Sequence, residues 1–438
     1  MPFEIDPRNA PIRVVELELG DRPARLSAPA ARTAPTPDVV GHAMALVRVH
    51  GRPVGLVAAH VAHPDAALET LAAAARRDLP DEIRAAREAG PAPRALEGAA
   101  PPLISVVIAT RERPHILARA LGSAVALDYP RFEVVVVDNA PATDATETMV
   151  RERFGDKVVY VREPMRGLAA AHNRGAAVAR GEIVAYTDDD VLIDPGWLTA
   201  LAAAFASAPD VACVTGLIVP GELRTRTQAL LEWHAKATKG FTRRVANLGD
   251  AGVDRLFPYT AGELGAGANM AFTAALLREL GGFDPAMGVG SATLGGDDLM
   301  AFFLAIATGH TLVYQPEALI WHHHHTDPQA LVNQARGHSV GLGAFLTGVA
   351  LHHPRMLPLL ARRLPAAAGH AVRRLASRSP GAAGPDTPVT LPRAVTAAER
   401  RGLLYGPLAY LRAGRAVRRT RTAPTAAPRP AAAPGAGR

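Results

Sequence analysis

Residues Leu103-Ile-Ser-Val-Val-Ile-Ala109 are the clearest indication of the fold, because this run is apolar at almost every position and rich in β-branched side chains. A strand without alternation is buried on both faces, which is typical of a parallel sheet covered by helices on both sides. A second apolar run follows at 132–137, after a helical pattern at 116–126. The same order continues with strand patterns at 158–161 and 182–186 around a helical pattern at 168–179. This alternation of strands and helices predicts an α/β domain.

The first ninety residues have a different pattern. Apolar and polar residues alternate over 12–19, and two further strand patterns, 43–49 and 53–61, flank a turn at His50–Arg52. Two helical patterns follow, so we expect a small α+β accessory domain at 1–90. Its role is open between packing against the main domain and recognising an acceptor or partner. The further boundaries that we expect are a Pro/Ala linker at 91–102, the main α/β domain at 103–345, a helical C-terminal extension at 346–412 and a disordered basic tail at 413–438.

The charge of the chain is concentrated at its C-terminal end. Lys and Arg number 48 and Asp and Glu 41, which gives the net charge of +7, yet no acid follows Glu399. A nucleic-acid enzyme more often carries its positive charge on the folded body, so we expect no nucleic-acid partner.

A single cysteine, Cys213, excludes an intramolecular disulfide and fits a reducing compartment. It lies in an apolar run, which favours a buried small side chain over a nucleophile. The chain shows no N-terminal signal pattern and no apolar run of spanning length. We therefore expect a cytoplasmic protein.

Polar residues follow the predicted strands at the points where ligands bind in open parallel sheets. They are Thr110-Arg-Glu-Arg-Pro114, Asp138-Asn139 and, after the strand at 182–186, Thr187-Asp-Asp-Asp190. No Gly-x-Gly-x-x-Gly motif follows the first strand and no Gly-Lys-Ser/Thr loop is present. Both absences count against a dinucleotide site or a P-loop.

Two acidic groups are the candidate chemical centres. An Asp-x-Asp pattern places Asp188 and Asp190 on one side of an extended segment and turns Asp189 away. Carboxylates arranged in this way suit a hard divalent cation that also binds substrate phosphates, although an acidic turn or helix cap gives the same pattern. The second group, Asp297-Asp298, opens an apolar segment that runs to Ala307. Capping accounts for Asp297, whereas Asp298 is a candidate general base.

These residues together resemble the family 2 glycosyltransferases, which have the GT-A nucleotide-sugar fold. The resemblance covers about 102–336, slightly over half of the chain, and rests on six motifs in one order. The motifs are Ser105-Val-Val-Ile-Ala-Thr-Arg-Glu-Arg-Pro114, Val136-Val-Asp-Asn139, Asp188-Asp-Asp190, Gly281-Gly-Phe-Asp284, Gly296-Asp-Asp298 and Trp321-His322.

The resemblance implies an inverting transfer of a sugar from a nucleotide-diphosphate donor. Asp190 and His322 then bind Mn²⁺ or Mg²⁺ at the diphosphate, and Asp298 takes the proton from the acceptor hydroxyl. Gly267, Asn269 and Asp297 lie beside the donor sugar and the acceptor. The residues that the resemblance places around the nucleotide and donor are Thr110, Arg111, Arg113, Asp138, Arg166, Asn173, Asp188 and Asp189.

The chain departs from the family pattern on the acceptor side. The family commonly has Glu-Asp, then Asp two residues later and an Arg further on, whereas here Asp297-Asp298 are followed by Met300 and Leu304. A nucleotide-sugar-binding pseudoenzyme or scaffold is therefore an alternative function. A sugar-phosphate nucleotidyltransferase is another, although 109–114 lacks the glycines of its phosphate loop. The Gln-x-x-Arg-Trp motif of processive synthases is absent, which favours transfer of a single residue.

Two C-terminal features leave alternatives open. Four adjacent histidines, His322 to His325, cannot all turn to one ion, so we expect no dedicated zinc site. The segment 399–412 is basic and amphipathic and, with the Arg-rich tail, is either solvated or lies on an anionic membrane. The acceptor is accordingly a glycan, a lipid-linked molecule or a small molecule. Contact with the inner face of the cell membrane is part of this expectation.

Overall fold

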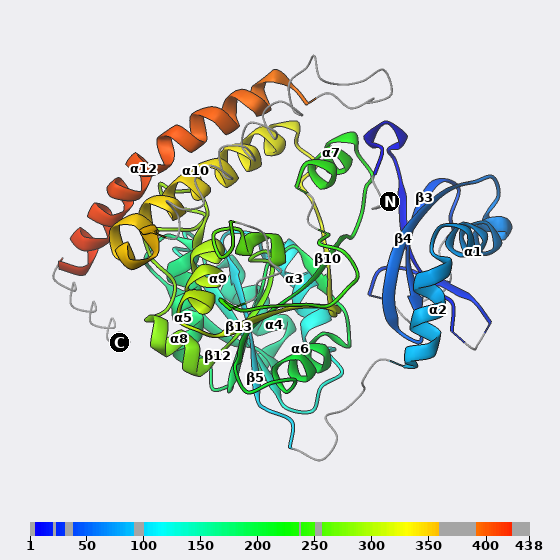
Figure 1. Cartoon of the computed structure of the whole chain (residues 1–438), viewed down its shortest axis with the longest axis horizontal. Coiled ribbons are helices and arrows are strands. Elements are labelled where there is room, and N and C mark those ends of the chain that lie inside the picture. The colour runs from blue at the N-terminus through cyan, green and yellow to red at the C-terminus, as the bar shows by residue number, and fades with distance from the viewer. Residues whose placement is uncertain are drawn as a thin grey trace, which may run out of the picture.

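The computed structural model describes residues 5–20, 23–30, 38–91, 100–235, 238–249, 256–358 and 391–422. These residues form a small N-terminal domain beside a larger domain built on its own sheet. Figure 1 shows the small domain on one side of the larger one, while helices α10 (Pro328–His352) and α12 (Arg393–Thr422) run together along the opposite edge.

The first half of the large sheet is parallel, as the apolar runs predict. Its strands are β5 (Ile104–Thr110), β6 (Phe132–Asn139), β7 (Val159–Glu163) and β8 (Ile183–Thr187), with β5 between β6 and β8 and β7 at the edge. The connecting helices are α3 (Pro114–Ala124), α4 (Ala145–Arg153), the 3₁₀ turn η3 (Gly155–Lys157) and α5 (Leu168–Val178).

The second half makes the sheet mixed. β12 (Asn269–Thr273) runs antiparallel between β8 and β10 (Val211–Pro220), and β13 (Thr311–His322) lies parallel to β10. β9 (Val191–Ile193) and β11 (Arg244–Ala246) pair with β13. This mixed sheet flanked by helices is an α/β fold, as the sequence predicts. The other elements of this domain are α6 (Trp197–Phe205), α7 (Arg226–Ala235), η4 (Ala261–Leu264), α8 (Ala274–Leu280), α9 (Asp297–Ala307) and η5 (Pro354–Met356).

The absence of alternation in the strands has a direct structural cause, since each face of the large sheet covers a separate hydrophobic core. In β5, Val106 and Ile108 belong to one core and Val107 to the other. Successive side chains of a strand point to opposite faces, so both sets must be apolar. Cys213 is fully buried in the second core, as expected of a small hydrophobic side chain.

The N-terminal domain is a four-stranded sheet with two helices on one face. Its elements are η1 (Pro7–Asn9), β1 (Arg13–Glu18), β2 (Arg25–Ser27), β3 (Gly41–Val49), β4 (Arg52–Val61), η2 (Pro64–Ala66), α1 (Ala67–Asp78) and α2 (Pro80–Ala89), with strand order β2-β1-β3-β4. The β3–β4 hairpin turns at His50 and Gly51, both with positive φ. The expected strands and helices are therefore present, and β2 was not predicted.

The other face of this small sheet packs against the large domain. Met44 and Leu46 of β3 share a buried cluster with Leu319 and Trp321 of β13. Arg48 crosses the interface, with its guanidinium donating to Glu16 Oε2 at 2.7 Å and to Asp194 Oδ2 at 2.6 Å. These buried charges are paired, as burial requires. Of the two roles left open for this domain, packing against the main domain is observed.

The C-terminal end differs from the expected boundaries. The boundary expected at residue 345 falls inside α10, and α12 continues to Thr422, so a disordered tail from 413 is wrong for 413–422. Ala413 packs among buried residues of α10, and Ala and Arg are strong helix formers. The remainder of that tail, part of the extension (359–390) and most of the linker (92–99) lie outside the described residues. Among the described helices, none combines the length and apolarity needed to cross a membrane.

Candidate functional site

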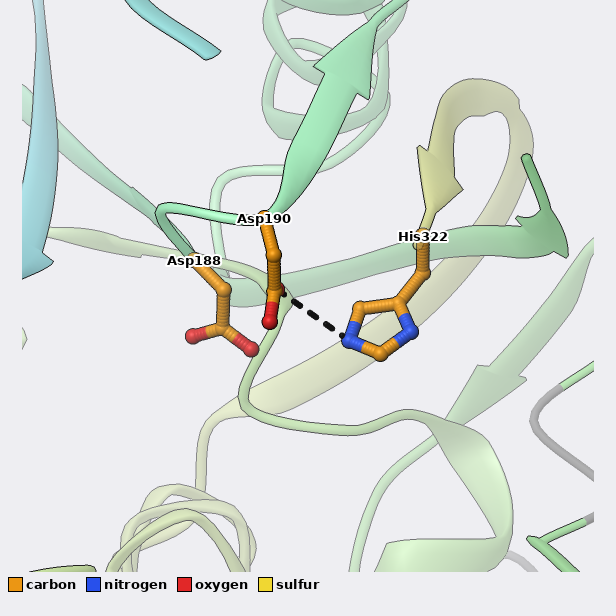
Figure 2. A group of neighbouring side chains, drawn as sticks. All are labelled: Asp188, Asp190 and His322. Carbon is orange, nitrogen blue, oxygen red and sulfur yellow. Dashed lines mark ion pairs between the residues drawn. The ribbon is translucent and has the colours of Figure 1, made fainter. Parts of the chain in front are cut away.

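Three side chains that are distant in sequence meet at one edge of the large sheet. Asp188 and Asp190 lie in the turn after β8, and His322 is the last residue of β13 (Figure 2). β9 pairs with β13 so that Val191 lies opposite His322, which brings the neighbouring Asp190 beside the imidazole. His322 Nε2 lies 3.3 Å from Asp190 Oδ1. One ligand atom from each of the three residues lies within 4.8 Å of the others.

The donor set of this cluster fits a divalent cation. It offers carboxylate oxygens from Asp188 and Asp190 and one imidazole nitrogen, and Asp190 is only 8% exposed. Asp190 Oδ1 is buried and takes part in no hydrogen bond within the described part of the chain. Carboxylate and phosphate oxygens suit Mg²⁺ and Mn²⁺, and imidazole suits the transition metals. The predicted metal residues Asp190 and His322 are therefore brought together, with Asp188 as a third candidate ligand.

The charges of the cluster are strongly coupled. Burial and the charge of Asp190 raise the pKa of Asp188 to about 7. Burial opposes ionisation of Asp190, but His322 and Arg113 overcome it and hold the pKa of Asp190 below its usual value. Burial likewise opposes protonation of His322, yet its contact with Asp190 raises the pKa of His322 to about 9. A positive charge is therefore favoured beside Asp190.

Asp189 is held by hydrogen bonds within the protein and fixes the acidic turn. It is 4% exposed and accepts hydrogen bonds from Thr110 Oγ1 and from Arg113 Nη1, both at 2.6 Å. Arg113 also donates to Asp190 Oδ2 at 3.0 Å. Burial raises the pKa of Asp189 to about 6, although Arg113 opposes the shift. Thr110 and Asp189, both predicted around the nucleotide and donor, therefore form a tether between β5 and the acidic turn.

The predicted nucleotide residues lie at the carboxyl ends of two adjacent strands. Thr110 of β5 and Asp138 of β6 are partners in the strand register. Asp138 is fully buried and accepts from Tyr160 Oη at 2.8 Å, whereas its Oδ1 has no hydrogen-bond partner among the described residues. Burial raises the pKa of Asp138. Arg111, which donates to Ala140 O at 3.3 Å, and Arg166 are both exposed at this edge.

Two of the predicted ligands, Asn173 and Asn269, form hydrogen bonds within the protein. Asn173 exchanges hydrogen bonds with the backbone of Phe283, at 2.7 and 2.8 Å, and so fixes the Gly281–Asp284 segment. Asn269 is fully buried, donates to Leu217 O at 3.0 Å and to Ala318 O at 2.8 Å, and accepts from Trp197 Nε1 at 2.9 Å. The amide groups of Asn173 and Asn269 are thus both engaged in hydrogen bonds within the protein.

The second acidic pair opens helix α9 and is held differently. Asp298 Oδ2 accepts from Gly267 N at 3.0 Å and Oδ1 accepts from Leu299 N at 2.8 Å. Burial and the neighbouring charge of Asp297 raise the pKa of Asp298 to about 6. A carboxylate fixed by two backbone N–H groups and poised near neutrality is suited to accept a proton. Gly267, which was predicted beside the donor sugar and the acceptor, therefore lies beside Asp298.

A residue that sequence reasoning missed lies behind this pair. His172 of α5 is 3% exposed, and its Nδ1 lies 3.5 Å from Asp297 Oδ2. The imidazole packs between the rings of Tyr186 and Phe283. Its proximity opposes the rise in the pKa of both Asp188 and Asp298, although burial has the larger effect. The signal in the sequence was weak: a single histidine before Asn173 in an alanine-rich helix.

The departures at Met300 and Leu304 have a structural explanation. Met300 is 4% exposed and packs in an apolar cluster with Phe345 of α10 and Tyr410 of α12, where Leu304 also packs. This side of α9 is therefore covered by the two C-terminal helices. A carboxylate or guanidinium at these positions would be buried among apolar side chains, so the apolar residues suit their environment.

A cavity of about 300 Å³ opens beside Asp190. It lies between the first turn of α3 and the histidines after β13, and Arg113 and Arg119 contribute positive charge to it. Of the other histidines, His324 is buried and its Nε2 lies 2.8 Å from Glu232 Oε2. His324 is therefore structural, and the histidine that joins the acidic cluster is His322.

Comparisons with known proteins identify the large domain. Residues 105–260 match the model of glycosyl transferase family 2, and residues 183–380 match that of glycosyl transferase family group 2. The glucosyl-dolichyl phosphate glucuronosyltransferase of Haloferax volcanii is 30% identical over 27% of this chain and 38% of its own length. The pre-mycofactocin glycosyltransferase of Mycobacterium tuberculosis is 30% identical over 51% of this chain and 43% of its own length.

The chain thus spans less than half the length of these curated relatives. Among solved structures, a mannosyltransferase from Pyrobaculum calidifontis in complex with GDP-Man and Mn²⁺ is 24% identical and has a TM-score of 0.41. That match covers 74% of this chain and 89% of the mannosyltransferase. The two family models together span residues 105–380, and the chain belongs to the family 2 glycosyltransferases.

Proposed function

We propose that the protein transfers one sugar residue from a nucleotide-diphosphate sugar to an acceptor hydroxyl, with inversion at the anomeric carbon and dependence on a divalent cation. The observation that carries the proposal is the cluster of Asp188, Asp190 and His322 at the carboxyl edge of the sheet. The exposed Arg111 and the buried Oδ1 of Asp138 lie at the ends of neighbouring strands of the same edge.

On the donor side, the residues bind and orient the diphosphate. Asp188, Asp190 and His322 hold Mn²⁺ or Mg²⁺, which when bound neutralises the charge that develops on the leaving nucleotide. Arg113 keeps Asp190 ionised and in place, and Asp189 keeps Arg113 in place. Asp138 Oδ1 accepts a hydrogen bond from the base, and Arg111 and Arg166 face the nucleotide side of the site.

On the acceptor side, Asp298 takes the proton from the attacking hydroxyl. Its two backbone hydrogen bonds fix the carboxylate, and its raised pKa makes it a better proton acceptor than an ordinary aspartate. Direct attack on the anomeric carbon, with one base and without a protein nucleophile, inverts the configuration there. The absence of a Gln-x-x-Arg-Trp motif supports transfer of a single residue.

The donor sugar and the acceptor stay open in this proposal. The two curated relatives are named for different transfers, one of them a glucuronosyl transfer to a dolichyl-phosphate-linked glucose. The pseudoenzyme alternative loses its main support, because Met300 and Leu304 are explained by packing under α10 and α12. No observation favours the nucleotidyltransferase alternative.

Thermal-shift measurements with UDP, GDP, dTDP and CDP, each with Mn²⁺, Mg²⁺ or EDTA, test the proposal. Binding to the native state raises the apparent melting temperature by mass action. We expect one nucleotide to raise it, and the shift to vanish with EDTA and in Asp190→Ala. The exposed acid Asp156, replaced by Ala, is the matched control and should retain the shift. A nucleotide shift that persists in EDTA and in Asp190→Ala would contradict the metal site.

A further inference from the structure

Helix α12 presents an apolar strip to solvent along its outer face. Leu404 is 82% exposed, and Leu408 and Leu411, one helical turn apart on the same side, are 44% and 46% exposed. Apolar side chains of this size are ordinarily scattered singly on a soluble surface. Three on one face of one helix form an apolar patch, which we call the leucine face.

Arginines flank the leucine face at both ends. Exposed Arg393, Arg400 and Arg401 precede it, and exposed Arg412, Arg415, Arg418 and Arg419 follow it. The one acid in α12, Glu399, lies off this face, with its Oε1 3.1 Å from His234 Nε2. The outer side of α12 therefore combines apolar side chains with positive charge and carries no carboxylate.

The inner side of α12 fixes this orientation. Gly402, Gly406, Ala409 and Ala413 are buried against the neighbouring helix α10. The helices approach so closely that a Cβ at Gly406 would lie 2.6 Å from Gly343 Cα of α10. Because this contact tolerates only small residues, α12 cannot roll to bury its leucines. Figure 1 shows α12 on the outer side of α10, and the exposure of its leucines makes the leucine face a fixed outward surface.

We propose that the leucine face of α12 docks on an anionic membrane surface. Leu404, Leu408 and Leu411 enter the boundary between headgroups and acyl chains, and the flanking arginines bind lipid phosphates. The charge pattern disfavours a second copy of the chain, because arginines would then face arginines. The leucines at the centre of the face disfavour a nucleic acid, which offers no apolar surface to bury them.

Docking there brings the acceptor side of the site close to the bilayer, an extension that rests on the proposed function. α10 lies between α12 and the start of α9: a Cβ at Gly343 would lie 2.7 Å from Leu403 O of α12, and a Cβ at Gly296 would lie 2.6 Å from Gly341 O. One helix therefore separates the leucine face from the turn that carries Asp298. With helices about 10–12 Å wide, that distance is roughly 20 Å. An acceptor anchored in the membrane is then within reach of the base.

Vesicle co-sedimentation of the full chain tests the docking. The probes are vesicles of phosphatidylcholine alone and of phosphatidylcholine mixed with phosphatidylglycerol. We expect binding to the anionic vesicles, little binding to the neutral ones, and a decrease with added salt. The double variant Leu404→Asp/Leu408→Asp should bind at least about tenfold more weakly, since two apolar anchors are lost. Leu351→Asp, at an exposed leucine of α10, is the matched control and should bind like the wild type.

Several results would overturn the proposal. One is absence of wild-type binding to anionic vesicles at low salt. Another is binding that survives Leu404→Asp/Leu408→Asp and is lost only when 423–438 are deleted, which assigns it to the tail. A third is a concentration-dependent dimer that the double variant disrupts, which assigns the leucines to self-association. A variant that retains the nucleotide-dependent thermal shift is folded. If Leu404→Asp/Leu408→Asp does not fold, the variant Leu404→Ser/Leu408→Ser is used in its place. Failure of vesicle binding with intact nucleotide shifts would leave the proposed function standing.

Discussion

Asp190 and Asp298, one from each of the two acidic pairs of the site, are the same residue type in opposite environments. Asp190 lies against two cationic side chains, Arg113 and His322, which hold its pKa below the usual value. Asp298 is held by backbone N–H groups and lies beside another carboxylate, so that burial and Asp297 raise its pKa to about 6. The surroundings of Asp190 favour a carboxylate that stays charged and can bind a cation, whereas those of Asp298 favour a carboxyl group that exchanges a proton. The difference lies in the surroundings of each carboxylate and not in its own chemistry.

The second comparison between the pairs is structural. The turn of Asp188 and Asp190 is built by the sheet itself, through β8, β9 and β13. The turn before Asp298 depends on the C-terminal helices, because Gly296 contacts Gly341 of α10 and Asp284 accepts from Tyr410 Oη of α12 at 2.7 Å. Substitutions in α10 and α12 should therefore affect the base and leave donor binding intact.

The largest expected effect comes from Asp298→Asn. An asparagine keeps an oxygen that can accept from Gly267 N but cannot take a proton from the acceptor. We expect kcat to fall by about 10³-fold, within the range of lost general-base catalysis. The nucleotide-dependent thermal shift should stay unchanged, in contrast to Asp190→Ala. Steady-state kinetics and thermal shifts on the same preparations separate the two roles, and a fully active Asp298→Asn protein would remove Asp298 as the base.

The pH dependence of the reaction sharpens the same contrast. The base works only when deprotonated, so with cation held at saturation kcat/KM should fall about tenfold per pH unit below the pKa of Asp298, about 6, and level off above it. In Asp297→Asn the neighbouring negative charge is gone, which lowers the pKa of Asp298 and moves the midpoint to lower pH. The pKa of an ordinary aspartate is about 3.9. A kcat/KM profile that stays flat from about pH 5 to about pH 8 at equal cation occupancy would therefore argue against Asp298 as the base.

Much of the fold and part of the candidate site were predictable from the sequence, and the reasons are physical. Apolar runs without alternation identify buried strands, and polar residues that follow them must gather at one edge of the sheet. Thr110, Asp138, Asp188 and Asp190 were found in this way. Asp298 was a candidate base because it belongs to an acidic pair that opens an apolar segment, and the family resemblance added its role toward the acceptor. His322 came from the family resemblance alone, since its spacing to the acidic turn carries no local signal.

The errors concern side chains whose partners depend on tertiary structure. Asn269 was expected at the donor sugar, but the register of β10 with β13 shifts between Gly216 and Leu217. Its amide donates to the carbonyls of Leu217 and Ala318 beside that irregularity. Nothing in the local sequence indicates a register shift between strands that lie so far apart along the chain. His172 was missed for the same reason, because its contact with Asp297 joins α5 to α9.

A smaller effect is expected from Gly341→Ala. The added Cβ would lie 2.8 Å from Gly295 C, so α10 or the turn before Asp298 must shift. We expect kcat to fall by about tenfold, as for other small displacements of a catalytic group, with the nucleotide shift retained. Gly414→Ala is the matched control, because a Cβ on this α12 glycine meets nothing within 4 Å. Equal kinetics in the two variants would show that α10 does not position the base.

The smallest expected effect is that of Tyr410→Phe. Its hydroxyl donates to Asp284 Oδ2 and joins α12 to the Gly281–Asp284 segment. Burial, and then Asp284, raise the pKa of Tyr410, so the phenol stays protonated and donates throughout the working pH range. Losing one such hydrogen bond should cost about 1 kcal/mol of unfolding free energy, measured by chemical denaturation.

The control for this last variant is Tyr405→Phe, whose hydroxyl accepts from exposed Arg412 Nη1 at 3.0 Å and should matter less. Because Asp284 also accepts from Ala286 N at 2.9 Å, the loop that leads to Asp298 keeps one anchor in Tyr410→Phe. A modest fall in the kcat of Tyr410→Phe with unchanged nucleotide binding would therefore indicate that α12 helps to position Asp298. If the two tyrosine variants have equal stability and equal kcat, the hydroxyl of Tyr410 does not help to position Asp298. The positioning would then depend on α10, and the role of α12 would lie in its outer, arginine-flanked face.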